Sequence, residues 1–331
     1  MPYKLRNNRR HKFKKVHYKI TNWPEYNEAL TKRGDITVWL SPGIIKAWHT
    51  DKNKPKQQGR QFKYSDIAIE ASLIIKTVYS LPYRATEGLL CSIITLMDLD
   101  LDIPDYTSMC RRTQILETSK LKNINNDEHI HILIDSTGLK IFGQGQWQEE
   151  KHGLKKRREW RKLHLVIDRN SQAIVAQELS TYHGSDDSQV GVLLKKIEQN
   201  ILSASADTAY DTDPVYEVIA KNTANSNSLI VAIPPRKDAA LSAHYQTSPT
   251  ARDHNILFAE KYGKYRWQDY SGYHYRALVE TAMFRYKTII GEKMFSRNLP
   301  AQKVESKVAC LVLNKMTSLG MPISSKIKNA A

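Results

Sequence analysis

The order of apolar runs between residues 129 and 235 constrains the fold of this 331-residue chain more than any other feature. Runs of this length bounded by turn residues are typical of buried strands, whereas apolar residues spaced three and four apart are typical of helices. The pattern predicts strands at His129–Asp135, Leu163–Asp168 and Ala173–Ala176, then a helix at 190–197, a strand at Ile201–Asp207, a helix opened by Pro214 and a strand at Leu229–Ile233. The first three strands predict an antiparallel meander, and the alternation after them predicts a mixed α/β sheet.

With a further helix after residue 271, this is the order of a ribonuclease-H-like mixed β-sheet flanked by helices. Asp135 and Asp207 each end one of the predicted strands. Strand ends are the usual place for a site in an open α/β sheet. A single aspartate at a strand end more often belongs to a turn or caps a helix, so each residue alone indicates little.

A third acid lies in the signature Y-x2-R-x3-E-x6-K, formed by Tyr273, Arg276, Glu280 and Lys287. On an α-helix that advances about 100° per residue, the four side chains fall within about 60° of one another. Apolar residues flank this polar face, which is typical of a helix that lines a cleft. The alternative is a surface helix in which Glu280 simply pairs with Arg276 or Lys287.

Three carboxylates that converge without a counter-charge repel one another, and divalent cations remove that conflict. Two Mg²⁺ ions about 3.5–4 Å apart stabilise the attacking and leaving oxygens of a phosphoryl displacement. We therefore expect Asp135 to bridge two Mg²⁺ ions, with Asp207 and Glu280 each holding one, and Mn²⁺ to substitute. Arg276 and Lys287 would then bind the phosphates of the strand that is cut.

The charge of the chain points to nucleic acid. Fifty Lys and Arg against thirty-four Asp and Glu give a formal net charge of +16 and a pI near 9.5. Such a surplus favours nucleic acid or an anionic membrane as partner. No apolar run approaches the roughly 18 residues of a transmembrane helix, and the basic N-terminus does not resemble a secretory signal. We expect no membrane partner and a cytoplasmic, nucleoid-associated protein.

Composition divides the chain into three parts. Residues 1–20 hold eight Lys or Arg and no acid, which predicts a basic arm along DNA or, alternatively, a solvated tail. Residues 21–126 predict a mainly helical DNA-binding or dimerisation domain, and residues 127–331 the catalytic domain with an insertion at about 236–271. In the helical domain, residues 107–117 predict a helix in which Arg111 and Arg112 read bases in the major groove. The alternative for that helix is packing or dimerisation only.

Two more segments are predicted to touch DNA. The basic cluster between residues 151 and 162 includes Lys155, Lys156, Arg157 and Arg158. Trp147 and Trp160 flank it, and rings beside cations are typical of nucleic-acid surfaces, although a charged hairpin tip has the same composition. Trp267, in the predicted insertion, is a candidate to stack on a flipped or unpaired base. The alternative for Trp267 is a local packing anchor.

Several motifs taken together resemble bacterial insertion-sequence transposases of the DDE class, in the insertion-sequence-5 family. Besides the signature, the resemblance rests on Asn22–Leu30, Leu81–Gly88, Asp135–Gly138, Trp160–His164, Ala206–Asp211 and Leu313–Pro322. It implies a ribonuclease-H-like core in which Asp135, Asp207 and Glu280 ligate two Mg²⁺ ions. It also implies that Tyr273, Arg276 and Lys287 contact DNA phosphates at the end of the element.

The expected activity is binding of terminal inverted repeats, hydrolysis at the end of the element, and attack of the freed 3′-OH on target DNA. Because two ends must be processed together, we expect a homodimer or a larger synaptic complex. Two alternatives remain at this stage. One is a ribonuclease-H-like nuclease or resolvase that cuts without joining, and the other is a DNA-binding repressor without catalytic activity.

Overall fold

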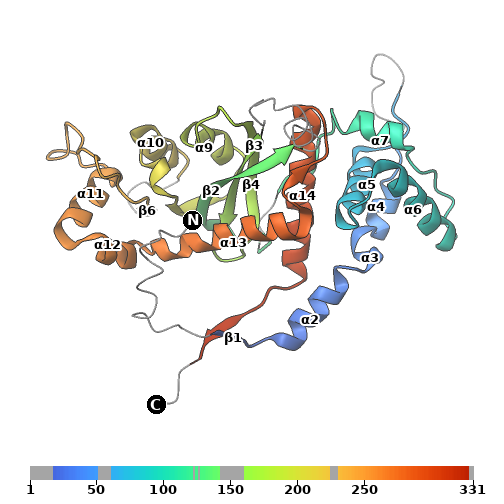
Figure 1. Ribbon diagram of the computed structural model, residues 1–331, viewed down its shortest axis with the longest axis horizontal. Helices are drawn as coiled ribbons and strands as arrows, with labels where there is room; N and C mark the ends of the chain where they lie inside the picture. The colour runs from blue at the N-terminus through green and yellow to red at the C-terminus, as the bar shows by residue number, and fades with distance from the viewer. Residues whose placement is uncertain are drawn as a thin grey trace, which may run out of the picture.

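A computed structural model describes residues 18–50, 61–121, 124–125, 127–141, 160–223 and 230–327. The first part of the chain contains the helices α2 (Trp23–Lys32), α3 (Ile36–Trp39), α4 (Pro42–Lys46), α5 (Asp66–Val78), α6 (Tyr83–Leu96) and α7 (Tyr106–Arg112). The rest contains α9 (Val190–Leu194), α10 (Asp213–Lys221), α11 (Ala251–Tyr262), α12 (Lys264–Ser271), α13 (Ala277–Arg285) and α14 (Leu299–Leu319). In Figure 1 α3 to α7 lie at one end of the molecule, beyond α14, α2 lies below α14, and α11 and α12 lie at the opposite end.

A six-stranded mixed sheet forms the centre of the molecule. Its strands are β2 (His129–Ile141), β3 (Trp160–Asp168), β4 (Ile174–Thr181), β5 (Asn200–Ser205), β6 (Ile230–Ala232) and β7 (Lys293–Met294). The order is β4-β3-β2-β5-β6, with β7 beside the end of β2. The pairs β4-β3 and β3-β2 are antiparallel, whereas β2-β5 and β5-β6 are parallel. The predicted meander followed by parallel strands is confirmed, and this is the ribonuclease-H-like arrangement.

Each face of the sheet has its own apolar layer, because successive side chains of a strand point to opposite sides. On β2, Ile132 and Ile134 belong to the core shared with α9 and α10. Leu133 and Leu139 belong to the core shared with α13 and α14. The sheet is therefore covered by helices on both faces, as its near-continuous apolar strands require.

The helix α14, which the sequence patterns did not predict as an element, joins the helical part to the sheet. Its residues Val312 and Met316 pack with Ile75 of α5, and Val304 and Val308 pack with Leu73. A separate two-stranded sheet pairs β1 (Tyr18–Ile20), near the start of the chain, with β8 (Ser324–Lys326), which follows α14. The last residues of the predicted basic arm are thus a strand, and residues 1–17 lie outside the described part.

Two local predictions need correction. The strand predicted to stop at Asp135 continues to Ile141, because Ser136 to Lys140 remain paired with β3. The helix predicted at 107–117 ends at Arg112. The predicted insertion at 236–271 holds α11 and α12.

Within the described residues, no helix is both long enough and apolar enough to cross a bilayer.

Candidate active site

Asp135 lies on the central strand β2, on the face covered by α13. It is two residues beyond Leu133, so the two side chains share that face. The residue is 9% exposed. One carboxylate oxygen accepts a hydrogen bond from the N–H of Ser136 at 2.8 Å. The strand thus presents a nearly buried acid to the helix above it.

Asp207 stands beside Asp135 because of the register of the parallel strands. Leu133 is opposite Ser205, so two further residues along each chain bring Asp135 and Asp207 to the same level. Asp207 caps the 3₁₀ turn Thr208–Tyr210 and accepts a hydrogen bond from the N–H of Ala209 at 2.8 Å. Its Oδ2 lies 3.9 Å from Nη2 of Arg276.

The signature segment is not one α-helix, which corrects the prediction. Residues Tyr273–Arg276 form a 3₁₀ turn, α13 follows, and Tyr286–Ile290 form a π-helical turn. Arg276 and Glu280 still occupy neighbouring turns and pair at 2.6 Å. The apolar flanks are confirmed, because Val279, Met283 and Tyr286 are buried against the sheet. The π turn alters the angular position of Lys287 relative to Glu280.

The Arg276 guanidinium joins all three acids. Its Nη2 donates to Asp135 Oδ2 at 2.7 Å and lies 3.9 Å from Asp207 Oδ2, while its Nη1 donates to Glu280 Oε1 at 2.6 Å. Its Nε is buried and has no hydrogen-bond partner among the described residues. The pairing of Glu280 with Arg276, which the sequence offered only as an alternative, is therefore part of the convergence of the three acids.

The surroundings of Asp135 disfavour its ionised form and so raise its pKa. Burial raises the pKa of the Asp135 carboxyl to about 6, although the adjacent Arg276 guanidinium lowers it. The charges of Asp207 and Glu280 raise that pKa further. A buried carboxylate with a displaced pKa between two other acids is typical of functional sites.

The donor set fits a hard divalent cation, because it consists only of carboxylate oxygens. All three acids face one positive group, the Arg276 guanidinium, which supplies the counter-charge that they require. In the described part of the chain, no three acidic, histidine or cysteine side chains are grouped closely enough to hold a metal ion. Asp135, Asp207 and Glu280 are nonetheless the acids that could do so once Arg276 no longer separates them.

Two of the predicted phosphate contacts lie along the same segment. The Tyr273 ring is partly buried, with its centroid 5.5 Å from that of Trp267, and burial raises the pKa of its phenol. Lys287 is partly exposed in the π turn and makes no hydrogen bond or ion pair with the described residues. The cluster of Lys155, Lys156, Arg157 and Arg158 lies outside the described residues.

Two predicted DNA contacts are wrong. Arg112 is 8% exposed, and its guanidinium donates to Asp66 at 2.5 Å and to the carbonyl of Tyr64 at 3.0 Å, so it anchors α7 to α5. Trp267 is 1% exposed and its Nε1 donates to Asn255 at 2.9 Å. It is a packing anchor and no base reaches it. Arg111, one residue before Arg112, remains exposed.

Residues behind β2 also shape the site, and the sequence patterns did not identify their roles. His164, fully buried, lies opposite Ser136 in the sheet, and its Nε2 shares a hydrogen bond with Ser180 at 2.8 Å. The Lys162 amine donates to Asp186 at 3.1 Å. Both belong to the segment Trp160–His164, one of the motifs on which the family resemblance rests. That resemblance is the only sequence feature that could have pointed to them. Both lie on β3, the strand that pairs with β2 beside Asp135.

Comparisons with known proteins agree with this geometry. A profile described as a transposase DDE domain matches residues 126–315, which is more than half of the chain. A second profile with the same description matches residues 31–144. The first profile includes Asp135, Asp207 and Glu280.

Two solved structures are similar in part. A cryo-EM structure of a piggyBac transposase synaptic complex with hairpin DNA aligns with 90% of this chain and 76% of that chain, at 12% identity and a TM-score of 0.40. A Drosophila P element transposase strand transfer complex aligns with 59% of this chain at 11% identity and a TM-score of 0.31. This chain spans 46% of the length of the P element chain. By the profile matches, the chain belongs to the DDE transposases and is a DNA transposase.

Proposed function

We propose that this transposase binds the terminal inverted repeats of an insertion sequence, cuts the DNA at the end of the element and joins the freed 3′-OH to target DNA. The observation that carries the proposal is the meeting of three acids at Arg276. Asp135, Asp207 and Glu280 come from segments up to 145 residues apart, and all three lie within 4 Å of one guanidinium. A structural ion pair needs one acid for one base, so the two extra acids indicate a further cationic partner.

DDE transposases generally use divalent metal ions. In this chain Asp135, Asp207 and Glu280 would hold them, and we infer two Mg²⁺ ions for which Mn²⁺ can substitute. When bound, such a pair stabilises the attacking and leaving oxygens of a phosphodiester displacement. No covalent intermediate with the protein is required.

The chain's own residues then have distinct tasks. Asp135 must be ionised to bind a cation, so its pKa of about 6 sets the lower pH limit of the site. Arg276 can bind a DNA phosphate only after its guanidinium leaves at least one carboxylate. Lys287, which makes no hydrogen bond or ion pair with the described residues, can bind a phosphate without breaking one. Tyr273, beside the same site, is the third phosphate contact of the proposal.

The net charge of +16 supports double-stranded DNA as the partner. Arg111 and the basic cluster at 155–158 are the proposed contacts outside the site. Because two ends of an element have to be cut and joined together, the working form is proposed to be a homodimer or a larger synaptic complex. The helical part of the chain and the arm at residues 1–20 are the proposed repeat-binding region.

One assay separates this function from its two rivals. The substrate is a labelled duplex that carries the inverted repeat flanking the gene, mixed with unlabelled target DNA and Mg²⁺ or Mn²⁺. Cleavage followed by joined product is expected. Cleavage without joining would identify a nuclease or resolvase, and binding without cleavage would identify a repressor.

The same assay tests the three acids. Asp135→Ala, Asp207→Ala and Glu280→Ala should each abolish cleavage while repeat binding persists. Asp238→Ala is the matched control, because Asp238 is exposed and has no partner among the described residues. Persistence of cleavage in any one of the three variants would contradict the site assignment.

A further inference from the structure

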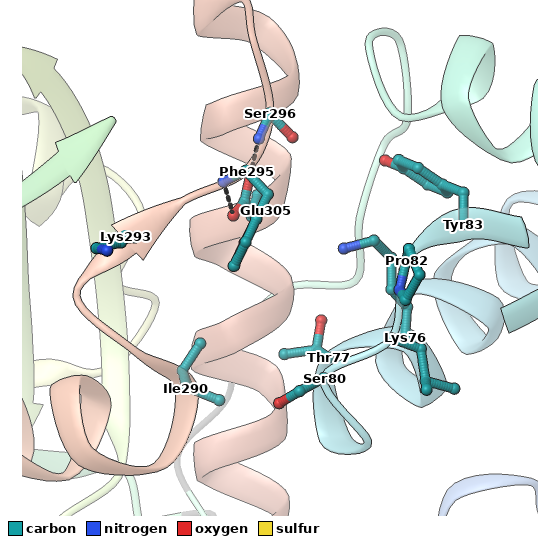
Figure 2. A pocket seen from close by; sticks show the side chains of 11 residues that line it. Lys76, Thr77, Ser80, Pro82, Tyr83, Ile290, Lys293, Phe295, Ser296 and Glu305 are labelled. Atoms are coloured by element: carbon teal, nitrogen blue, oxygen red, sulfur yellow. Dashed lines mark hydrogen bonds between the residues drawn. The ribbon is translucent and has the colours of Figure 1, made fainter. Parts of the chain in front are cut away.

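A cavity of about 380 Å³ lies between the helical part of the chain and the segment that follows the signature. This volume is within the range of pockets that bind small ligands. Figure 2 shows one wall formed by the end of α5 and the start of α6, and the other formed by β7 and α14. Its lining residues are Lys76, Thr77, Ser80, Leu81, Pro82, Tyr83, Ile290, Lys293, Phe295, Ser296 and Glu305. None of them has a role in the chemistry described above.

The amine of Lys76 forms no ion pair in this cavity, although the charge of the Glu305 carboxylate acts on it. It lies 5.1 Å from the centroid of the Tyr83 ring and 5.9 Å from that of Phe295, and it forms no hydrogen bond or ion pair with the described residues. Burial lowers its pKa. An amine that lies near two rings and makes no direct ion pair can still bind an anion from outside.

The one acid in the lining is already engaged. The Glu305 carboxylate accepts hydrogen bonds from the N–H groups of Phe295 and Ser296, each at 2.8 Å. This fixes the backbone that carries the Phe295 ring. Phe295 is 60% exposed. The rim of the cavity therefore presents an aromatic surface to solvent.

The cavity is close to the cutting site along the chain. Ile290 ends the π turn that carries Lys287, and Lys293 pairs with Lys140 on β2. Lys140 is five residues beyond Asp135, or about 17 Å along the strand. A DNA strand held at the three acids would thus have its neighbouring nucleotides within reach of the cavity.

We infer that this cavity binds one unpaired nucleotide, with its base against the rings of Tyr83 and Phe295 and its phosphate on Lys76. An aromatic platform beside cations is the combination that binds single-stranded nucleic acid. The inference rests on the proposed function for the origin of the nucleotide in a DNA strand. The same chemistry would accept a free nucleotide, and the experiment separates the two sources.

The test uses the full chain in a chelator, so that no cleavage occurs. Binding is measured by fluorescence anisotropy for a blunt duplex and for the same duplex with one unpaired terminal nucleotide. We expect the unpaired nucleotide to improve affinity about tenfold or more. Phe295→Ala and Lys76→Met should remove this preference. Tyr265→Ala and Lys46→Met, at an exposed ring and an exposed lysine outside the cavity, should keep it.

A salt titration and a crosslink locate the contact. Lys76→Met should reduce the slope of log K against log salt by about 0.7 for the duplex with the unpaired nucleotide, and Lys46→Met should not change the difference between the two duplexes. Replacing the unpaired base by 5-iodouracil should give a photocrosslink to Tyr83 or Phe295. A crosslink found only elsewhere, for example at Tyr265, would overturn the inference.

Equal affinity for both duplexes in the wild-type chain, without a thermal shift from 2′-deoxyadenosine 5′-monophosphate, would also overturn it. A Lys76-dependent shift from that nucleotide, without preference for the unpaired end, would assign the cavity to a free nucleotide. If the cavity variants left the preference intact while cleavage and joining proceeded, the inference would fail and the proposed function would stand. If the wild-type chain did not join DNA but kept its preference for the unpaired nucleotide, the proposed function would fail and this inference would stand.

Discussion

Two nearly buried aspartates of this protein have pKa values displaced in opposite directions. Asp253, at the start of α11, is 1% exposed, and burial by itself would raise its pKa. Hydrogen bonds from the backbone and hydroxyl groups of Ser242 and Thr250, at 2.7–2.8 Å, instead lower it to about 2. Asp135 has one backbone donor and one guanidinium, stands beside two other acids, and has a pKa of about 6.

The difference lies in what each carboxylate is bonded to. Asp253 is saturated by neutral donors that come from its own turn and capping box, so its charge stabilises the fold. Asp135 depends on a single cation that two other acids share. Its charge is poorly satisfied by the protein alone, and this is what a group reserved for an external partner requires.

The largest expected difference between the two is in activity. Asp135→Asn should reduce cleavage at least about a thousandfold, because several kcal/mol of transition-state stabilisation is lost and each 1.4 kcal/mol is about a factor of ten. Asp253→Asn should leave the rate per folded molecule unchanged. Cleavage assays at a temperature where both variants are folded check this, and similar losses in both would break the comparison.

The pH dependence of stability should separate them next. A folded-state pKa of about 6 for Asp135, above its ordinary value of 3.8, means that the folded protein binds the extra proton between these values. Stability should therefore fall by about 3 kcal/mol as the pH rises from 4 through 6 without metal. Urea unfolding in the presence of a chelator measures this decline. Asp135→Asn should flatten the plot of the free energy of unfolding against pH between pH 4 and 6. A curve in which the variant retains the full decline would contradict the account.

Asp253 should behave in the opposite way. Its pKa of about 2 lies below the ordinary 3.8, so its contribution of about 2 kcal/mol is present above pH 4 and is lost as the pH falls toward 2. Asp253→Asn should lower the free energy of unfolding by about that amount at pH 7. The same urea experiment checks it, with Asp238→Asn as an exposed control. Unfolding at an unchanged urea concentration would mean that the four hydrogen bonds contribute little.

The smallest effect concerns Trp267, which bonds to Asn255 of the same helix as Asp253. Trp267→Phe replaces the indole by a smaller ring, and the loss of its hydrogen bond to Asn255 should by itself cost about 1 kcal/mol. DNA affinity should not change, because the indole is buried in the protein. Thermal unfolding and a DNA-binding titration on the same variant provide the measurement. A marked loss of affinity without a loss of stability would restore the base-stacking role that the structure contradicts.

The three acids could be predicted from the sequence because each signal was local. Asp135 and Asp207 follow apolar runs, and Glu280 stands at a fixed distance from Arg276 in a signature. The contact from Arg276 to Asp135 spans 141 residues, and no local pattern encodes it. The 3₁₀ and π turns around α13 were also missed, because Tyr273 to Ile290 have ordinary helical composition.

The two failures among the DNA contacts have the same physical cause. Arg112 and Trp267 are residue types that often bind DNA, and composition cannot show that Asp66 or Asn255 already bonds them. The sheet order was predicted because strands and helices alternate with clear periods. The helix α14 was not predicted, although it packs on one face of the sheet and also against α5 of the helical part of the chain.

Direct titration with Mn²⁺, followed by calorimetry at a pH above 6, tests the central claim that Asp135, Asp207 and Glu280 form one divalent-metal site. The wild-type chain and Asp253→Asn should bind Mn²⁺ with the same affinity. Asp135→Asn, Asp207→Asn and Glu280→Gln should each lose most of that binding while remaining folded. Equal Mn²⁺ affinity in all five proteins would contradict the account.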